Sequence, residues 1–119
     1  SAKCATVTLA VDEKQVTLEA IVDSGNSLTD AFGMSEVIIS DNKTANRLLG
    51  DLQSNACHSR YRALPCGTVS SVDILDGYRL EHATITFENR QKQLEKPILA
   101  VSKVALQDCE AIINPKTLE

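Results

Sequence analysis

Apolar and polar residues alternate in two stretches near the N-terminus, from Ala5 to Val11 and from Gln15 to Val22. Alternation with a period of two is typical of half-buried β-strands, and the threonines and valines of both stretches favour the same structure. The polar cluster Asp12-Glu13-Lys14 separates them. The pattern therefore predicts a β-hairpin that ends after Val22.

Later apolar runs predict that most of the chain is β-structure. Val37-Ile38-Ile39, within Ser35 to Ser40, predicts a strand buried on both faces. Turn signals at Cys66-Gly67 and Asp76-Gly77, and the polar stretch Asn89-Arg90-Gln91-Lys92, separate further strand candidates. These candidates are Arg60 to Pro65, Val69 to Leu75, Leu80 to Glu88 and Lys96 to Ser102. Short strands at nearly even spacing predict a small sandwich or barrel.

Two short helical segments interrupt this pattern. Lys43 to Leu52 places its apolar residues on one face, with Thr44 or Asn42 as a cap and a weakened end at Gly50. Glu110 to Leu118 ends in a predicted turn of helix. There Asn114 is the expected N-cap and Pro115 the first helical residue.

The composition narrows the classes of protein that the chain can belong to. Its 119 residues fit one domain, and 12 basic against 16 acidic residues give a net charge of −4. This balance argues against a nucleic-acid partner and against binding to an anionic membrane surface. The four cysteines lie far apart and form no standard zinc pattern with His58, so we expect reduced thiols, no metal and no cofactor.

The candidate chemistry lies where the second strand of the predicted hairpin ends. Ala20-Ile21-Val22 is followed at once by Asp23-Ser24-Gly25. A carboxylate that activates water needs a rigid strand to hold it, a hydroxyl to orient it and a glycine to turn the backbone. The same three residue types are common in ordinary turns, so the tripeptide alone is a weak signal.

The order of motifs resembles a retropepsin-like subunit and, more closely, the stage II sporulation protein GA family. The resemblance rests on Asp23 to Asp30, the Val37-Ile38-Ile39 strand, Arg60 to Val69 and Glu110 to Leu118. Asn114 departs from both patterns, because retropepsins carry glycine there and the sporulation family commonly carries histidine before the proline. Ala31 stands where a proline often follows the loop.

The resemblance implies a mainly β fold over residues 1–119, a single-lobe pepsin/retropepsin-like acid protease barrel with one or two short helices. It implies that Asp23 is catalytic and that an apolar pair supports its loop from behind. A mid-chain hairpin would act as a flap over the cleft. The implied residues are Asp23 (catalytic), Ser24, Gly25 and Asn26 (catalytic loop), Pro65, Cys66, Gly67, Thr68 and Val69 (flap), and Ile112 and Ile113 (support).

The resemblance further implies an aspartic endopeptidase that works as a homodimer with one Asp per subunit and processes a sporulation sigma-factor precursor. It implies a cytoplasmic domain of a bacterial cell membrane protein, with a membrane-embedded N-terminal half and an extracellular activator. We therefore expect this chain to be a fragment. Ser1-Ala2 and Leu118-Glu119 have the composition of expression remnants.

Two other classes of function remain open at this stage. One is a non-catalytic module that uses the same fold for dimerisation or peptide binding. The other is an unrelated small β-sandwich in which Asp23-Ser24-Gly25 is only a turn. The effect of an Asp23→Ala substitution on cleavage separates both from a peptidase.

Overall fold

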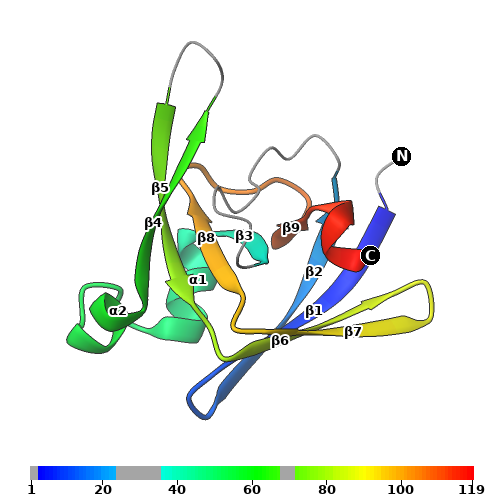
Figure 1. Cartoon of the computed structure of the whole chain (residues 1–119), viewed down its shortest axis with the longest axis horizontal. Helices are drawn as coiled ribbons and strands as arrows, with labels where there is room; N and C mark the ends of the chain where they lie inside the picture. Colours follow the sequence, from blue (N-terminus) through cyan, green and yellow to red (C-terminus); the bar gives the residue numbers. More distant parts are fainter. Residues whose placement is uncertain (1–2, 24–35, 68–71) are drawn as a thin grey trace.

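The computed structural model of the chain describes residues 3–23, 36–67 and 72–119, and Figure 1 shows their path. These ranges contain nine β-strands, two short α-helices and a final 3-10 helix. The prediction of a mainly β chain is therefore confirmed. Nothing in the described ranges forms a helix long and apolar enough to cross a membrane.

The first two strands form the predicted hairpin. β1 (Lys3–Val11) pairs antiparallel with β2 (Lys14–Val22), in a register that places Thr8 opposite Thr17. The hydroxyl oxygens of these threonines lie 3.1 Å apart, while alternate residues such as Val7, Leu9 and Leu18 are fully buried. The alternation of the sequence thus corresponds to one solvated and one buried face.

Three short strands lie beside β2 at the centre of the sheet. They are β3 (Val37–Asp41), β8 (Ile98–Ser102) and β9 (Ala111–Ile113). β9 runs parallel to β2 and antiparallel to β3, and β3 runs parallel to β8. Ile38 packs into the larger hydrophobic cluster and its neighbours Val37 and Ile39 into a smaller one on the opposite face. The predicted strand buried on both faces is confirmed.

Two more hairpins complete the sheet: β4 (Tyr61–Gly67) with β5 (Val72–Arg79), and β6 (His82–Phe87) with β7 (Arg90–Glu95). The predicted turn positions are shifted. Cys66 and Gly67 are the last two residues of β4, Asp76-Gly77 lies inside β5, and the stretch Asn89-Arg90-Gln91-Lys92 runs from a tight turn into β7. Polarity does not exclude a strand there, because β7 lies at the edge of the sheet and faces water.

The helices follow the predicted positions only in part. α1 (Asn42–Leu49) is capped by Asp41, whose side chain accepts from the Thr44 N–H, and not by Thr44 or Asn42. α2 (Asn55–Arg60), capped by Ser54, has no counterpart among the predicted elements. The 3-10 helix η1 (Pro115–Leu118) has Asn114 as its N-cap and begins with Pro115, as predicted.

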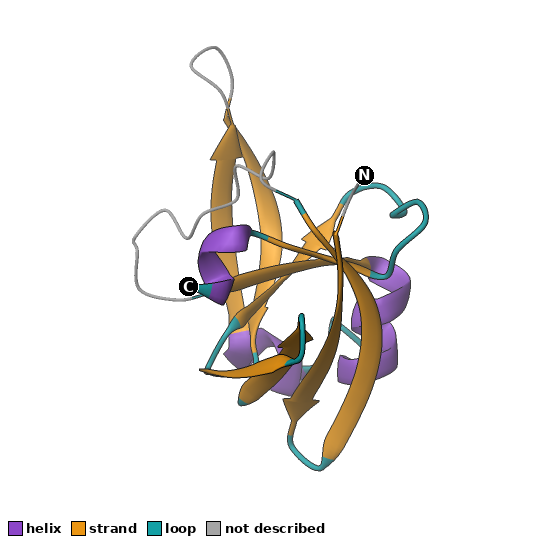
Figure 2. Ribbon diagram, turned by 90° about the vertical axis from the view of Figure 1, so that its right-hand side faces the viewer, coloured by secondary structure: helices purple, strands orange, loops and turns teal. Residues whose placement is uncertain are grey.

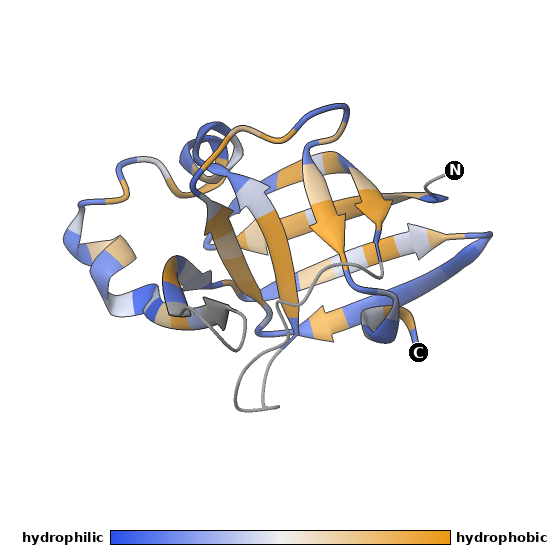
Figure 3. Cartoon of the chain, turned by 90° about the horizontal axis from the view of Figure 1, so that it is seen from above, coloured by the Kyte–Doolittle hydropathy of each residue, from blue (hydrophilic) through white to orange (hydrophobic). Residues whose placement is uncertain are grey.

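The described strands form one sheet in the order β4-β5-β8-β3-β9-β2-β1-β6-β7. Among the described strands the sheet is open, since no described pairing joins β4 to β7, and the predicted retropepsin-like barrel is therefore not confirmed. Figure 2 shows how strongly its strands curve. Twist lets one sheet fold over its own buried face without joining its edges. Hydrophobic residues concentrate on the central strands, whereas β7 is largely hydrophilic (Figure 3).

Candidate active site

Asp23 lies directly after the last residue of β2 and is exposed. Its backbone N–H donates to the carbonyl oxygen of Ile113, at 2.9 Å. This bond extends the hydrogen bonding between β2 and β9 to the residue after β2, so the backbone of Asp23 is tied to β9. The side chain of Asp23 therefore extends from a backbone that is held in place, and it is accessible to solvent. A carboxylate that activates water requires both.

The apolar pair Ile112-Ile113 lies beside the strand that carries Asp23. Ile21 is the partner of Ile112, and Val22 is the partner of Ile113. Ile113 is completely buried in the larger cluster, whereas Ile112 is partly buried and packs against the smaller one. β9 is thus packed on both faces where it contacts the end of β2.

Several residues of the predicted site lie outside the described residues. These are Ser24, Gly25 and Asn26 of the catalytic loop, and Thr68 and Val69 of the flap. Of the remaining flap residues, Pro65 is exposed in β4 opposite Ile74, and Cys66 and Gly67 end β4. In Figure 1 the β4–β5 hairpin rises on the same side of the molecule as the end of β2.

One face of the β4–β5 hairpin is held to its surroundings at two places. Leu64 and Leu75 are buried in the smaller hydrophobic cluster. Asp73, two residues before Leu75 and therefore on the same face, lies closer to the tip and pairs with the Lys103 ammonium at 2.5 Å. This hydrogen bond and the Ile74 N–H lower the pKa of the Asp73 carboxyl below its usual value. Ile74, on the opposite face, is 54% exposed, so the hairpin presents an apolar side chain to solvent there.

Two tyrosines brace the other end of this hairpin. The Tyr61 hydroxyl donates to the Asp76 carboxylate at 2.9 Å, and this bond raises the pKa of Tyr61 above 10.0. Burial raises the pKa of Tyr78, and the negative charge of Asp76 raises it further. The two rings meet edge to face with their centres 5.9 Å apart.

Two carboxylates outside the predicted site hold the segment that precedes β9. One oxygen of Asp41 accepts from the Thr44 N–H and the other from the Leu106 N–H, each at 3.2 Å. Glu110 accepts from the Glu19 N–H of β2 and pairs with Arg47 of α1, each at 3.1 Å. The chain is therefore tied to α1 and β2 immediately before it enters β9.

The sequence carries a signal for only one of these two residues. Asp41 stands directly before a helical pattern, where the N-cap rule favours an aspartate. Glu110 has no such signal, because its partners Glu19 and Arg47 are 91 and 63 residues away. Within the described ranges, no three His, Cys, Asp or Glu side chains come together as a metal site.

These features define a small, mainly β protein with a candidate carboxylate centre at the end of a central strand. The model of a peptidase family, described as sporulation factor SpoIIGA, matches residues 1–117 of the 119-residue chain. The chain therefore belongs to the SpoIIGA family of sporulation peptidases. No curated protein matches it.

Proposed function

We propose that this chain is the catalytic domain of an aspartic endopeptidase, in which Asp23 activates the attacking water. The observation that carries the proposal is the position of Asp23, an exposed carboxylate whose backbone is bonded to Ile113 at the end of a central strand. Membership of a peptidase family supports a hydrolytic function for this carboxylate.

The mechanism requires two copies of the chain. Aspartic proteases use two carboxylates about 3 Å apart that share one proton, and each subunit contributes one Asp23. A two-fold axis would bring the two residues together. The ionised carboxylate takes a proton from water while the protonated one donates to the scissile carbonyl oxygen, which yields a tetrahedral gem-diol. Neither a covalent intermediate nor a metal ion takes part.

The remaining predicted residues have supporting roles in this proposal. Ser24 and Gly25 orient the carboxylate and leave room for the substrate backbone, and Asn26 contacts the substrate main chain. Ile112-Ile113 supports the catalytic loop from behind. The flap, Pro65 to Val69, closes over an extended peptide and excludes water.

The proposed substrate is a sporulation sigma-factor precursor, which the resemblance implies and the family description is consistent with. The proposed setting is the cytoplasmic side of a bacterial membrane, where a membrane-embedded N-terminal half would anchor the domain and an extracellular activator would control it. Anchoring raises the effective concentration of subunits, so the separated domain should dimerise weakly.

The test is cleavage of the purified precursor by the chain and by a tandem fusion of two copies. We expect cleavage by the tandem, and its loss in a tandem with Asp23→Asn in both copies. Glu13→Gln, which removes an exposed carboxylate from the β1–β2 turn, is the matched control and should retain activity. Undiminished cleavage by the Asp23→Asn tandem would refute the proposal.

Sedimentation equilibrium of the single chain, over a wide concentration range, tests the two-fold site separately. Cleavage by a chain that stays monomeric would contradict a shared site. A dimer that cleaves nothing, even as a tandem, would indicate the non-catalytic module instead.

A further inference from the structure

The strand that holds the backbone of Asp23 is only three residues long. β9 pairs with β2 over Ala111–Ile113, and the Asp23 N–H then donates to the carbonyl oxygen of Ile113. A shift of β9 along β2 would therefore move the acceptor of that bond. Because the paired stretch is so short, the register of β9 depends strongly on what holds its two ends.

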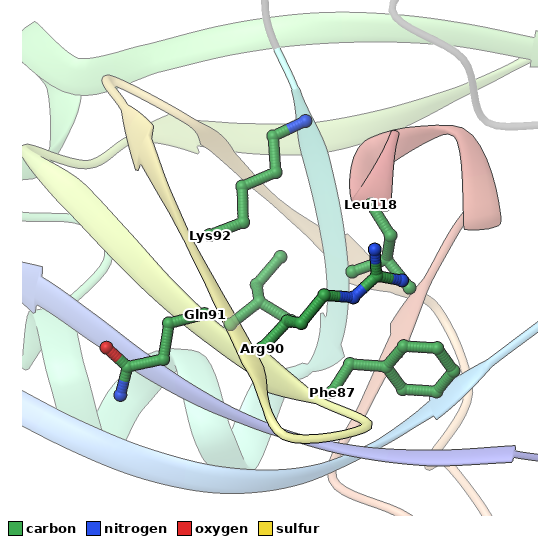
Figure 4. Close-up of a pocket in the computed structure, with 6 residues that line it drawn as sticks. Phe87, Arg90, Gln91, Lys92 and Leu118 are labelled. Carbon is green, nitrogen blue, oxygen red and sulfur yellow. The ribbon is translucent and has the colours of Figure 1, made fainter.

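The C-terminal end of β9 leads into η1, which is held mainly by packing. Thr117 is buried, Leu118 packs against the larger hydrophobic cluster, and the Lys92 ammonium donates to the main-chain oxygen of Glu119. A pocket of about 190 Å³ remains between η1 and the β6–β7 hairpin, and Figure 4 shows Leu118 and Phe87 in its lining. Close packing without voids is what makes neighbouring elements move together, so η1 constrains β9 only in part.

The N-terminal end of β9 is held by hydrogen bonds from Glu110 to the backbone of β2. The Glu110 N–H donates to the carbonyl oxygen of Glu19 at 2.9 Å, and the Glu19 N–H donates to Glu110 Oε1 at 3.1 Å. The Glu110 side chain thus accepts from β2 directly before β9 begins. Two directional bonds to one residue of β2 fix the place at which β9 starts.

Glu19 and Asp23 direct their N–H groups toward the same neighbouring strand. Successive residues of a strand point their N–H groups to opposite sides, so residues 19 and 23, four apart, point to the same side. The acceptor for the first is Glu110 Oε1 and the acceptor for the second is the carbonyl oxygen of Ile113. Glu110 therefore fixes one end of the same row of hydrogen bonds that holds Asp23 at the other end.

The second carboxylate oxygen of Glu110 faces α1. Arg47 Nη1 lies 3.1 Å from Glu110 Oε2, and the two side chains are 47% and 41% exposed. An ion pair between such exposed groups contributes little to stability. Water can replace Glu110 as the acceptor for the Glu19 N–H, but it cannot hold β9 in place. The specific contribution of Glu110 is therefore to the position of β9.

We propose that Glu110 is a positioning residue for Asp23. By holding the start of β9 on β2, it fixes the carbonyl oxygen of Ile113 and, through it, the backbone from which the Asp23 carboxylate extends. A misplacement of about 1 Å can lower an enzymatic rate about 100-fold. The effect of Glu110 on rate rests on the proposed peptidase function, whereas its effect on the Asp23 N–H does not.

Glu110 also has a simpler role, as a surface charge paired with Arg47. Two conservative variants separate the roles. Glu110→Gln keeps an acceptor oxygen at the same reach and loses the charge, whereas Glu110→Asp keeps the charge and is shorter by one methylene. If Glu110 positions β9, glutamine should replace it and aspartate should not. If Glu110 acts only as a charge, the order is reversed.

The first measurement is amide hydrogen exchange of Asp23, followed by NMR in the single chain. Glu110→Ala and Glu110→Asp should speed this exchange by at least about tenfold, and Glu110→Gln and Arg47→Gln by less than about threefold. The Val7 amide of β1, which lies between β2 and β6, reports opening of the whole sheet and should exchange at an unchanged rate.

The second measurement is cleavage of the precursor by the tandem fusion. Glu110→Ala in both copies should lower kcat by about tenfold or more and leave KM within about twofold, because Glu110 makes no contact with substrate in the proposed mechanism. Glu110→Gln should retain most of the original kcat. Glu13→Ala, which removes an exposed carboxylate from the β1–β2 turn, is the control and should match the original chain.

Three outcomes would overturn the proposal: unchanged Asp23 exchange in Glu110→Ala, equal acceleration at Val7, or replacement of Glu110 by aspartate but not by glutamine. Full kcat in the Glu110→Ala tandem would also overturn it. If the original tandem cleaves nothing, the proposed peptidase function fails, and the exchange of the Asp23 amide alone decides whether Glu110 positions this residue.

Discussion

The backbone N–H of Asp23 donates to the carbonyl oxygen of Ile113 at 2.9 Å, and this bond joins the candidate catalytic residue to a strand near the other end of the chain. Ile113 is completely buried, so the acceptor is fixed by the core. The precision with which Asp23 is held therefore depends on the packing of a residue that makes no contact with substrate in the proposed mechanism.

Ile113→Ala should destabilise the fold by about 2–5 kcal/mol, the usual cost of removing a large buried aliphatic side chain. Ile112→Ala is the matched control. Ile112 is only partly buried, so its truncation leaves a smaller cavity and should cost clearly less. Urea unfolding measures the free energy of unfolding of each variant. Equal decreases in the two variants would contradict the difference in burial between Ile113 and Ile112.

Asp41→Ala should lower the free energy of unfolding by about 1–2 kcal/mol, the upper part of the range for a lost N-cap. The loss exceeds that of an ordinary cap because the same carboxylate also accepts from the Leu106 N–H. Asp41→Asn keeps one side-chain oxygen as an acceptor and should fall between Asp41→Ala and the original chain.

The control for Asp41 is Asp51→Ala. The exposed Asp51 carboxylate accepts from the Gln53 N–H two residues away, so the change should stay within about 0.5 kcal/mol. Thermal unfolding followed by circular dichroism compares all three variants. An Asp41→Asn variant as stable as the original chain would show that the second oxygen contributes nothing.

Gly77→Ala should destabilise the protein by about 1–3 kcal/mol through overpacking. An added Cβ would lie 2.9 Å from both Ile98 Cγ2 and Leu64 Cδ1, and 3.0 Å from the Arg62 carbonyl oxygen. Gly50 gives the contrasting case, with nothing within 4 Å of its added Cβ but a φ of +71°. Its ψ of −135° places Gly50 in a region that is essentially open to glycine only, so Gly50→Ala should cost about 1–3 kcal/mol from backbone strain alone.

The two glycine variants can be told apart by what rescues them. Leu64→Val, which removes the Cδ1 atom that the new Cβ would meet, should recover part of the stability of Gly77→Ala and none of that of Gly50→Ala. Chemical unfolding of the single and double variants measures this coupling. Gly77→Ala more stable than the original chain would rule out the close approach of β4, β5 and β8.

Alkaline titration of tyrosinate absorbance should show both tyrosines ionising above pH 10.0, the ordinary value. The chain has two tyrosines and no tryptophan, so the signal belongs to Tyr61 and Tyr78 alone. Asp76→Ala should lower the pKa of Tyr61, because it removes the hydrogen-bond acceptor and its negative charge.

The raised pKa values also predict how stability changes at high pH. The folded state holds the tyrosine protons more tightly than the unfolded state does, so this contribution is fully present below pH 10 and is lost as pH rises through the folded-state pKa values. Unfolding measured across the alkaline range should show this decline, and Asp76→Ala should make it shallower. A steeper decline in the variant would contradict the Tyr61–Asp76 bond.

The local pattern of residues was sufficient to predict strands that have a buried face and a helix whose N-cap residue directly precedes it in the sequence. The β1–β2 hairpin follows from alternation, β3 from a short apolar run, and η1 from Asn114 and Pro115. The local pattern was insufficient where neighbouring strands determine the secondary structure. β7 is polar and still a strand because β6 pairs with it, and Gly77 lies within β5 because two neighbouring strands approach it closely.

The sequence by itself determined the mainly β class, the order of most strands along the chain and the place of Asp23 after an apolar strand, because each of these depends on residues close together in the chain. Only the tertiary structure decided that β9 lies between β2 and β3, that the sheet is open, and that Asp41 and Glu110 hold the segment before β9. These arrangements depend on hydrogen bonds and packing between residues far apart in sequence, for which the local pattern of polar and apolar residues carries no signal.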